Sequence, residues 1–225
     1  TVVTVINTPT VITAGDTTLD DKNLRVVGTT LTIDGTHSYR NVELLNGAVL
    51  THSEATESTE PGLDITVWSL AIDGASSIDV NARGYLGGNR PGNAAANGLT
   101  VGNTLGASST SAGSYGGLGS LFGGATNPTY GSLVSPAELG SGGSSRGGSY
   151  PGGDGGGRVK ISAINIAADG AISANGAIGS GNVSGSGSGG SINIVTSSLS
   201  GAGDISANGG GYQLGAEIGR ASCRE

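Results

Sequence analysis

Methionine is absent from the chain, and cysteine occurs once, at Cys223, among 225 residues. A single thiol excludes the disulfide framework typical of small secreted domains. Charge is scarce as well: 10 Lys and Arg stand against 17 Asp and Glu, and the basic residues form no cluster, so we expect no nucleic-acid partner. No run of about 18 apolar residues occurs, so we also expect no membrane insertion.

The C-terminal segment 217–225 breaks abruptly with the pattern before it. It reads EIGRASCRE, which corresponds residue for residue to the translation of a common sequencing adapter. We interpret 217–225 as a non-native adapter translation and set it aside, as one does for vector scars. The remainder then has no cysteine, and we interpret it as a metagenomic fragment that is part of a larger multi-domain chain.

Glycine is the most abundant residue type, with 45 copies. It follows no strict three-residue period, which excludes collagen. Between the glycines, short strings of Ile and Val occur with alternating spacing. This regularity favours an ordered fold over low-complexity disorder.

One spacing of apolar residues recurs three times along the chain. Each copy has intervals of 5, 6 and 3 residues and ends on asparagine. Apolar pairs at positions i and i+2 within a copy follow the two-residue period of strands. A unit repeated in this way predicts turns stacked in an array. The copies are Val67, Ile72, Ile78 and Asn81; Ile161, Ile166, Ile172 and Asn175; and Ile194, Leu199, Ile205 and Asn208.

We therefore predict an all-β fold, a single-stranded parallel β-helix (β-solenoid) with a long glycine-rich insertion. The coil is expected to be right-handed, because parallel crossovers almost always are. The apolar pattern fails in the insertion, where long connections usually indicate function or disorder. The predicted division is 1–82 for the N-terminal solenoid turns, 83–157 for the insertion, packed on the solenoid as a flap, 158–216 for the C-terminal turns, and 217–225 for the adapter translation.

The asparagine that ends each copy, Asn81, Asn175 or Asn208, is expected to stack at the same corner of successive turns. Asparagine tolerates tight corners, and its amide can bond along the stack. We interpret these three residues as a structural ladder. Asp34, Asp73, Asp169 and Asp204 lie at or near turns and are interpreted as turn-forming.

No cofactor or metal ligand is assigned from the sequence. Aspartate ladders in solenoids can bind calcium through oxygen ligands. The nine-residue calcium-binding phrase of such solenoids, GGxGxDxUx, does not occur in the chain. Calcium stays possible but has no motif to support it.

Tyrosines are scattered through the glycine-rich insertion. A tyrosine ring can pack on a glycine surface while its hydroxyl stays in water, and rings with polar tips suit sugar surfaces. We therefore predict a glycan-contacting face, and the low charge of the chain favours neutral glycans. Its candidate residues are Tyr85, Tyr115, Tyr130 and Tyr150.

Catalysis finds less support among the residues, and no catalytic residue is assigned. Inverting glycoside hydrolysis needs two carboxylates across a substrate, and Asp20–Asp21 is an adjacent pair without a matching context. The Arg158–Lys160 segment resembles a substrate-binding segment of polygalacturonases, but the Gly-His-Gly companion of that family is missing. His37 and His52 have no serine or cysteine phrase around them.

Taken together, these phrases resemble the glycine-rich parallel β-helix segments, pectin-lyase-like or adhesin-like, of large bacterial secreted or cell-surface proteins. The resemblance implies a secreted or surface location and a non-catalytic structural or adhesive module with a polysaccharide or cell-surface glycan as partner. A polysaccharide lyase or glycoside hydrolase is the alternative. Ice or mineral binding ranks last, because threonines do not recur from turn to turn. The likeness rests on Ser77–Tyr85, Tyr130–Leu133, Pro136 with Leu139–Gly143, Gly152–Gly157 and Ile172–Gly176.

Overall fold

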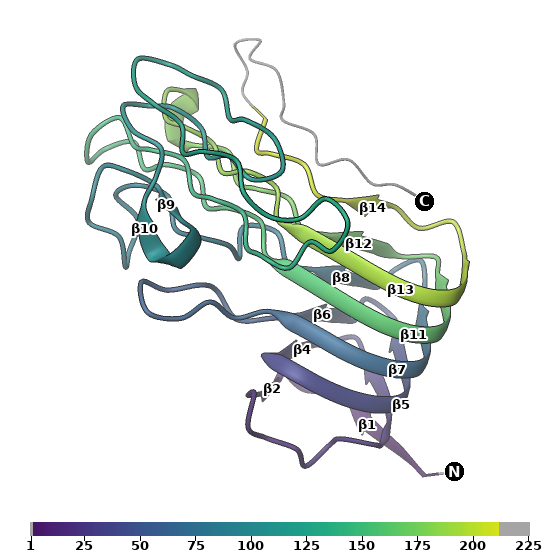
Figure 1. The fold of residues 1–225 in the computed structure, drawn as a ribbon. Helices are drawn as coiled ribbons and strands as arrows, with labels where there is room; N and C mark the ends of the chain where they lie inside the picture. The colour runs from purple at the N-terminus through teal and green to yellow at the C-terminus, as the bar shows by residue number, and fades with distance from the viewer. Residues whose placement is uncertain (1, 212–225) are drawn as a thin grey trace.

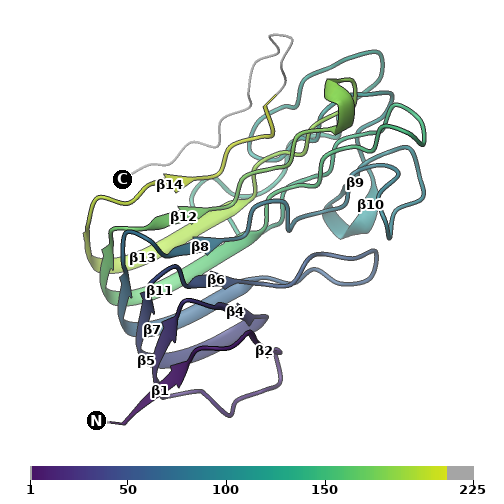
Figure 2. The same ribbon diagram turned by 180° about the vertical axis from the view of Figure 1, so that it is seen from behind.

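The computed structural model describes residues 2–211, which form mostly strands arranged in two six-stranded parallel sheets (Figure 1). The first sheet, in spatial order, contains β1 (Val3–Ile6), β3 (Asn23–Val27), β5 (Gly35–Leu45), β7 (Leu63–Ile72), β11 (Arg158–Ala168) and β13 (Ser191–Ser200). The second contains β2 (Thr10–Ile12), β4 (Thr30–Ile33), β6 (Val49–Thr51), β8 (Ser77–Asp79), β12 (Ala171–Ser173) and β14 (Ile205–Ser206), and is seen best from behind (Figure 2).

Four smaller elements lie outside these sheets. The strands β9 (Leu99–Thr100) and β10 (Thr104–Leu105) form an antiparallel pair around the 3-10 turn Val101–Asn103, and a second such turn covers Ser180–Asn182. The adapter-like segment 217–225 lies outside the described residues.

Successive strands of the chain alternate between the two sheets, so each pair of strands adds one layer to both. The sequence repeat appears directly in the pairing: Ile161 lies opposite Ile194, and Ile172 opposite Ile205. This arrangement confirms the all-β prediction and is compatible with a β-helix-like fold. The sheets are open, with β1 and β13 at the edges of one and β2 and β14 at the edges of the other.

The long strands of the first sheet bend halfway along (Figure 1). Tyr39 pairs with Val67 before the bend, and Asn41 pairs with Ser69 after it. Between these pairs, Arg40 and Trp68 are not paired in the register. The bend makes a corner that repeats on successive strands.

The core lies between the sheets and consists of Ile, Leu and Val in columns. Ile65, Ile161, Ile78 and Ile172 are each 0% exposed. They stack because the pairing places one above the other, Ile65 on Ile161 and Ile78 on Ile172. Each such burial stabilises the fold by about 1.5–3 kcal/mol, so the columns provide the main apolar driving force.

The glycine-rich segments 83–157 and 176–190, named here the glycine bundle, run away from one side of the sheets and lie beside one another (Figures 1 and 2). Their bonding has a three-residue period. Gly140 and Gly143 donate to one neighbour, the segment 153–156, whereas Gly142 and Ser145 donate to another, the segment 96–99. A period of three is that of the extended polyproline-II type of helix.

Glycine is required in the bundle because backbones approach one another too closely for a side chain. A Cβ atom added to Gly142 would overlap the carbonyl oxygen of Leu86, and one added to Gly155 would overlap that of Gly140. The bundle also crosses the boundary expected at residue 157, since the segment 184–190 bonds to the segment 141–157. The glycines of the insertion and of the later loop therefore build one body.

Candidate functional site

The asparagine ladder lies where the chain leaves the second sheet for the glycine bundle. The backbone N–H of Asn175 donates to Oδ1 of Asn81 at 2.6 Å, and that of Asn208 donates to Oδ1 of Asn175 at 2.7 Å. Asn175 also donates through Nδ2 to Oγ of Ser206 at 3.2 Å. The structure thus brings the three asparagines together, bonded along the stack as a structural ladder requires.

The candidate tyrosines divide into a buried group and one exposed residue. Tyr85 and Tyr115 are 1% and 5% exposed, so neither presents a ring face to a glycan. Tyr130 is half-buried, and its ring meets that of Tyr115 edge-on with centroids 5.0 Å apart. Tyr150 is 44% exposed. The face expected from the four residues is therefore not assembled.

The hydroxyl groups of Tyr115 and Tyr130 are bonded inside the bundle. Tyr115 donates to Oε2 of Glu138 at 3.1 Å, and Tyr130 donates to the carbonyl oxygen of Leu139 at 2.6 Å. Burial raises the pKa of Tyr115 to about 12 and raises that of Tyr130 further. These tyrosines hold segments of the bundle together, a role that the amphipathic ring also allows.

A buried polar network centres on Asn127, a residue to which the sequence pattern assigns no role. Its Nδ2 donates to Oγ1 of Thr100 and Oγ of Ser141, each at 3.1 Å, and its Oδ1 accepts from the N–H of Ser114 at 2.9 Å. Thr100 and Ser141 also bond to each other at 2.7 Å. Because nothing in the residue pattern marks these contacts, only the three-dimensional fold reveals them.

The network underlies an open hollow of about 320 Å³ on the surface of the bundle. Hydroxyl groups and short apolar side chains share its lining, and it contains no charged residue, a chemistry that suits a neutral polar ligand. Leu105 on its rim is 63% exposed. The lining residues are Thr100, Val101, Thr104, Leu105, Gly106 and Thr126 to Tyr130.

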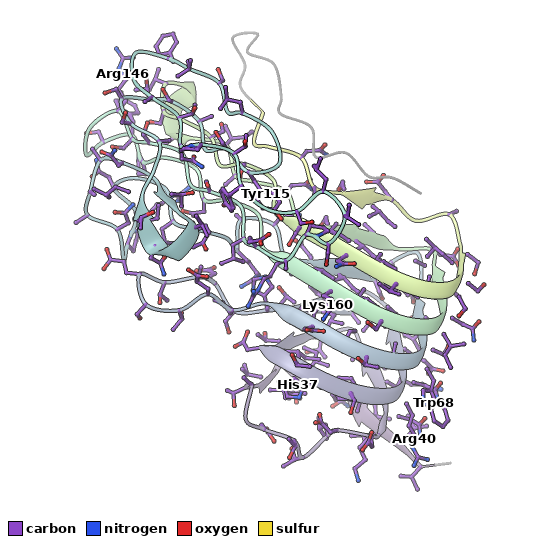
Figure 3. The ribbon with its side chains drawn as sticks, in the orientation of Figure 1. His37, Arg40, Trp68, Tyr115, Arg146 and Lys160 are labelled. Atoms are coloured by element: carbon purple, nitrogen blue, oxygen red, sulfur yellow. The ribbon has the colours of Figure 1, made fainter. Side chains whose placement is uncertain are left out.

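A second exposed feature lies at the corner of the first sheet. Trp68, the sole tryptophan of the chain, is 61% exposed, and the Cζ atom of Arg40 lies 6.0 Å from its ring centroid (Figure 3). Trp68 is not among the site residues predicted from the sequence, although the sequence holds a signal for it. Ile65 and Val67 face inward, so strand alternation places the residue after Val67 outward.

The aspartates at turns accept hydrogen bonds from backbone N–H groups. Asp34 accepts from N and Oγ of Ser53, both at 2.7 Å. Asp73 accepts from the N–H of Asn46 at 2.7 Å, and its pKa is lowered, chiefly by the Ser76 hydroxyl. Further aspartates that accept a backbone N–H are Asp16, Asp79 and Asp169.

The acidic pair Asp20–Asp21 is divided between two structural bonds. Oδ1 of Asp20 contacts Nδ1 of the buried His37 at 3.0 Å, and Oδ1 of Asp21 accepts from the hydroxyl of Ser38 at 3.3 Å. Lys160, in the segment similar to that of polygalacturonases, bonds to Asp64 at 3.2 Å. These groups do not converge on a common substrate position.

His52 is fully buried between the end of β6 and the beginning of β11. Its Nδ1 donates to the carbonyl oxygen of Ser53 at 2.7 Å, and its Nε2 accepts from the N–H of Arg158 at 3.1 Å. Only a neutral imidazole makes both bonds. Burial accordingly lowers the pKa of His52 to about 4.

Asp154 is a half-buried carboxylate of the bundle. It accepts from the N–H of Gly87 at 2.7 Å and faces Nε of Arg90 at 3.5 Å. Burial raises its pKa. The contacts fix two neighbouring glycine segments, so we assign Asp154 a structural role.

Within residues 2–211, no cluster of three or more His, Cys, Asp or Glu side chains is suited to hold a metal ion. The same part of the chain contains no helix with the length and apolarity needed to cross a membrane. Comparison with known proteins adds no relative: no family model matches the chain, and no curated protein or solved structure is significantly similar to it.

Proposed function

We propose that the chain is a non-catalytic structural and adhesive module of a bacterial secreted or cell-surface protein, and that it contacts glycans. In this proposal the two sheets are a right-handed parallel β-solenoid of the pectin-lyase-like or adhesin-like kind, and the glycine bundle is the part that it presents. The observation that carries the proposal is the use of the turn aspartates. They accept backbone N–H groups, as Asp34 and Asp73 do, instead of facing a cleft.

The two histidines are likewise engaged in structural hydrogen bonds. Burial keeps His52 neutral, and its neutral ring bonds to two backbone groups, whereas His37 is buried against Asp20. A hydrolase would need two carboxylates that face each other across a substrate and are free to exchange protons. The bonding of Asp20 to His37 and of Asp21 to Ser38 favours the structural alternative.

The glycan contact is supported by surface chemistry in the bundle. The hollow combines the hydroxyls of Thr104 and Thr129 with apolar groups such as Leu105, and this mixture matches the alternating polar and apolar faces of a sugar. Tyr150 remains available as an exposed ring. Tyr85 and Tyr115 are withdrawn from the proposed contact because they are buried.

The test is a glycan array probed with the full chain, run beside an assay for released reducing ends and unsaturated sugar products on the glycans that bind. Heat-denatured protein serves as the control for non-specific adhesion. We expect binding without release. Release of sugar ends would replace the proposal by the enzyme, and absence of binding to any glycan would remove the adhesive function.

A further inference from the structure

The corner that contains Trp68 repeats across neighbouring strands and begins with two cations. The N–H of Arg40 donates to the carbonyl oxygen of Lys22 at 2.9 Å, so these residues are neighbours. Arg40 is in turn next to Trp68, because the flanking pairs Tyr39–Val67 and Asn41–Ser69 lie in register. Adjacent strands are about 4.8 Å apart. Lys22, Arg40 and Trp68 therefore form one short row along the outside of the corner.

The ring of Trp68 stands on a surface of mostly short side chains. Its neighbours include Thr66 and Ser69 on its own strand, and Asn165, which pairs with Ser69 on the next strand. Ile164 precedes Asn165 at the corner and is itself 53% exposed. None of these covers the indole, and 61% of Trp68 is exposed. Scattered apolar side chains are normal on a surface, but an exposed tryptophan on a sheet beside two cations is a more specific arrangement.

Neither cation of the row has a recorded carboxylate partner within residues 2–211. Within residues 2–211, the structure records carboxylate partners for Arg25, Arg90 and Lys160, whereas it records none for Lys22 or Arg40. The acids nearest to them along the chain are already bonded, Asp21 to the Ser38 hydroxyl and Glu43 to Arg25. In this part of the chain, two cations without a carboxylate partner thus lie together, although the net charge of the whole sequence is −7.

This combination selects a ligand with two features. An indole face binds the C–H face of a pyranose ring, because both are flat and apolar. A guanidinium binds an oxyanion through paired N–H donors, and an ammonium adds a second charge. A sugar ring that carries a carboxylate or sulfate offers both groups within the few ångströms that separate Trp68 from Arg40.

We propose that the row Lys22–Arg40–Trp68 is a binding site for acidic glycans, with the sugar ring stacked on Trp68 and its anionic group bonded to Arg40 and Lys22. The inference rests on the proposed glycan contact and gives it a second site and a ligand class distinct from the neutral hollow. It differs from the expectation of neutral glycans based on low overall charge, because two cations without a recorded carboxylate partner lie at the corner.

The experiment uses the fluorescence of Trp68, which reports on this site alone because the chain has one tryptophan. The full chain is titrated with oligomers of alginate, hyaluronan and heparin as acidic probes, and with cellohexaose as the neutral probe. We expect a saturable change in emission with at least one acidic probe and none with cellohexaose. Raising the salt concentration should weaken the binding, since exposed charges are screened.

Single-residue variants test whether the row Lys22–Arg40–Trp68 is responsible for the binding of acidic probes. Arg40→Gln should weaken acidic-probe binding about tenfold or more, as expected for loss of a charged hydrogen bond, and Trp68→Ala should abolish it in calorimetry. Lys160→Gln is the matched control, because it removes one positive charge from the same sheet at a residue already paired with Asp64. Ile164→Ala changes the apolar surface of the corner but not its charge, and should weaken binding less than Arg40→Gln. Circular dichroism spectra must match those of the unsubstituted chain.

The outcomes separate the two proposals. If acidic probes bind and neither Trp68→Ala nor Arg40→Gln weakens them, the corner site is wrong while the glycan function stands. If cellohexaose binds as well as the acidic probes, the assigned ligand class is wrong. If neither the array nor the titrations detect any glycan, both proposals fall.

Discussion

Nε2 of His52 accepts a hydrogen bond from the backbone N–H of Arg158 at 3.1 Å, although the two residues lie 106 positions apart in the sequence. The bond joins the last strand before the loop at 52–62 to the first strand after the glycine-rich insertion. It holds only while the imidazole is neutral, since a protonated Nε2 has no lone pair to offer. We therefore expect the junction to be sensitive to acid.

Acid should therefore destabilise the chain through His52. Its pKa is about 4 in the folded chain and about 6.5 in the unfolded chain. The unfolded state binds more protons between these values, so the stability from the neutral histidine is complete above pH 6.5 and lost as the pH falls toward 4. The expected loss is about 3 kcal/mol, converted from the pKa difference.

Urea denaturation at pH 7.5 and pH 4.5 measures this loss. His52→Gln is the control: its amide Oε1 can replace Nε2 as an acceptor but does not titrate, so its free energy of unfolding should change less between the two pH values. Equal changes in both proteins would assign the acid sensitivity to carboxylates instead.

Close backbone packing makes the glycine bundle sensitive to a single methyl group. Gly142→Ala should reduce the free energy of unfolding by about 3 kcal/mol or more, because its Cβ would overlap the Leu86 carbonyl and the segments would have to separate. Gly148→Ala is the matched control, since a Cβ there meets nothing within 4 Å. Thermal unfolding of both variants makes the comparison, and equal melting temperatures would contradict the packing described for the bundle.

The asparagine ladder should contribute to stability through its side-chain acceptors. Asn175→Ala removes the acceptor for the N–H of Asn208 and should cost about 1–2 kcal/mol. Asn175→Asp keeps an oxygen at the same position and should cost less. Denaturation at neutral pH distinguishes the two variants, and an alanine variant as stable as the unsubstituted chain would show that the ladder does not contribute.

Two tyrosines of the bundle should respond differently to truncation, one as a structural residue and one as an accessible residue. Tyr115→Ala should destabilise the chain by about 3–5 kcal/mol because its ring is buried against Tyr130. Tyr150→Ala should change stability little and is the variant in which glycan binding can be measured cleanly. Differential scanning calorimetry is the measurement. A tolerated Tyr115→Ala would return that residue to the candidate glycan contacts.

The strand columns were predictable because their cause is local and repeated. Each turn needs an inward apolar residue at the same place, so the interval between Ile161 and Ile194 in the sequence is also their pairing in the sheet. The same alternation places Trp68 outward, because Val67 before it faces the core. Its cationic neighbours could not be predicted in this way, since they lie on other strands.

The glycine bundle and its tyrosines could not be predicted from the residue pattern either. The segments of the bundle are joined by backbone N–H and C=O groups, which nearly every residue has. These contacts therefore require no particular side chains and produce no recognisable sequence pattern. The abundance of glycine indicates that backbone segments pack closely, but it does not identify which segments are neighbours. The burial of Tyr85 and Tyr115 depends on those partners, because a tyrosine is suited to a wet surface and to a packed interior alike.

In the glycine bundle, the groups that hold the segments together are different from the groups that are exposed to solvent. The segments around Gly142 and Gly155 are fixed by main-chain groups, whereas the connections between segments carry exposed side chains such as Leu121 and Val134. A change of side chain at those two positions removes none of the bonds that define the bundle. The exposed side chains of the connections can therefore vary in sequence while the backbone structure of the bundle stays the same, so one fold can present many different contact surfaces.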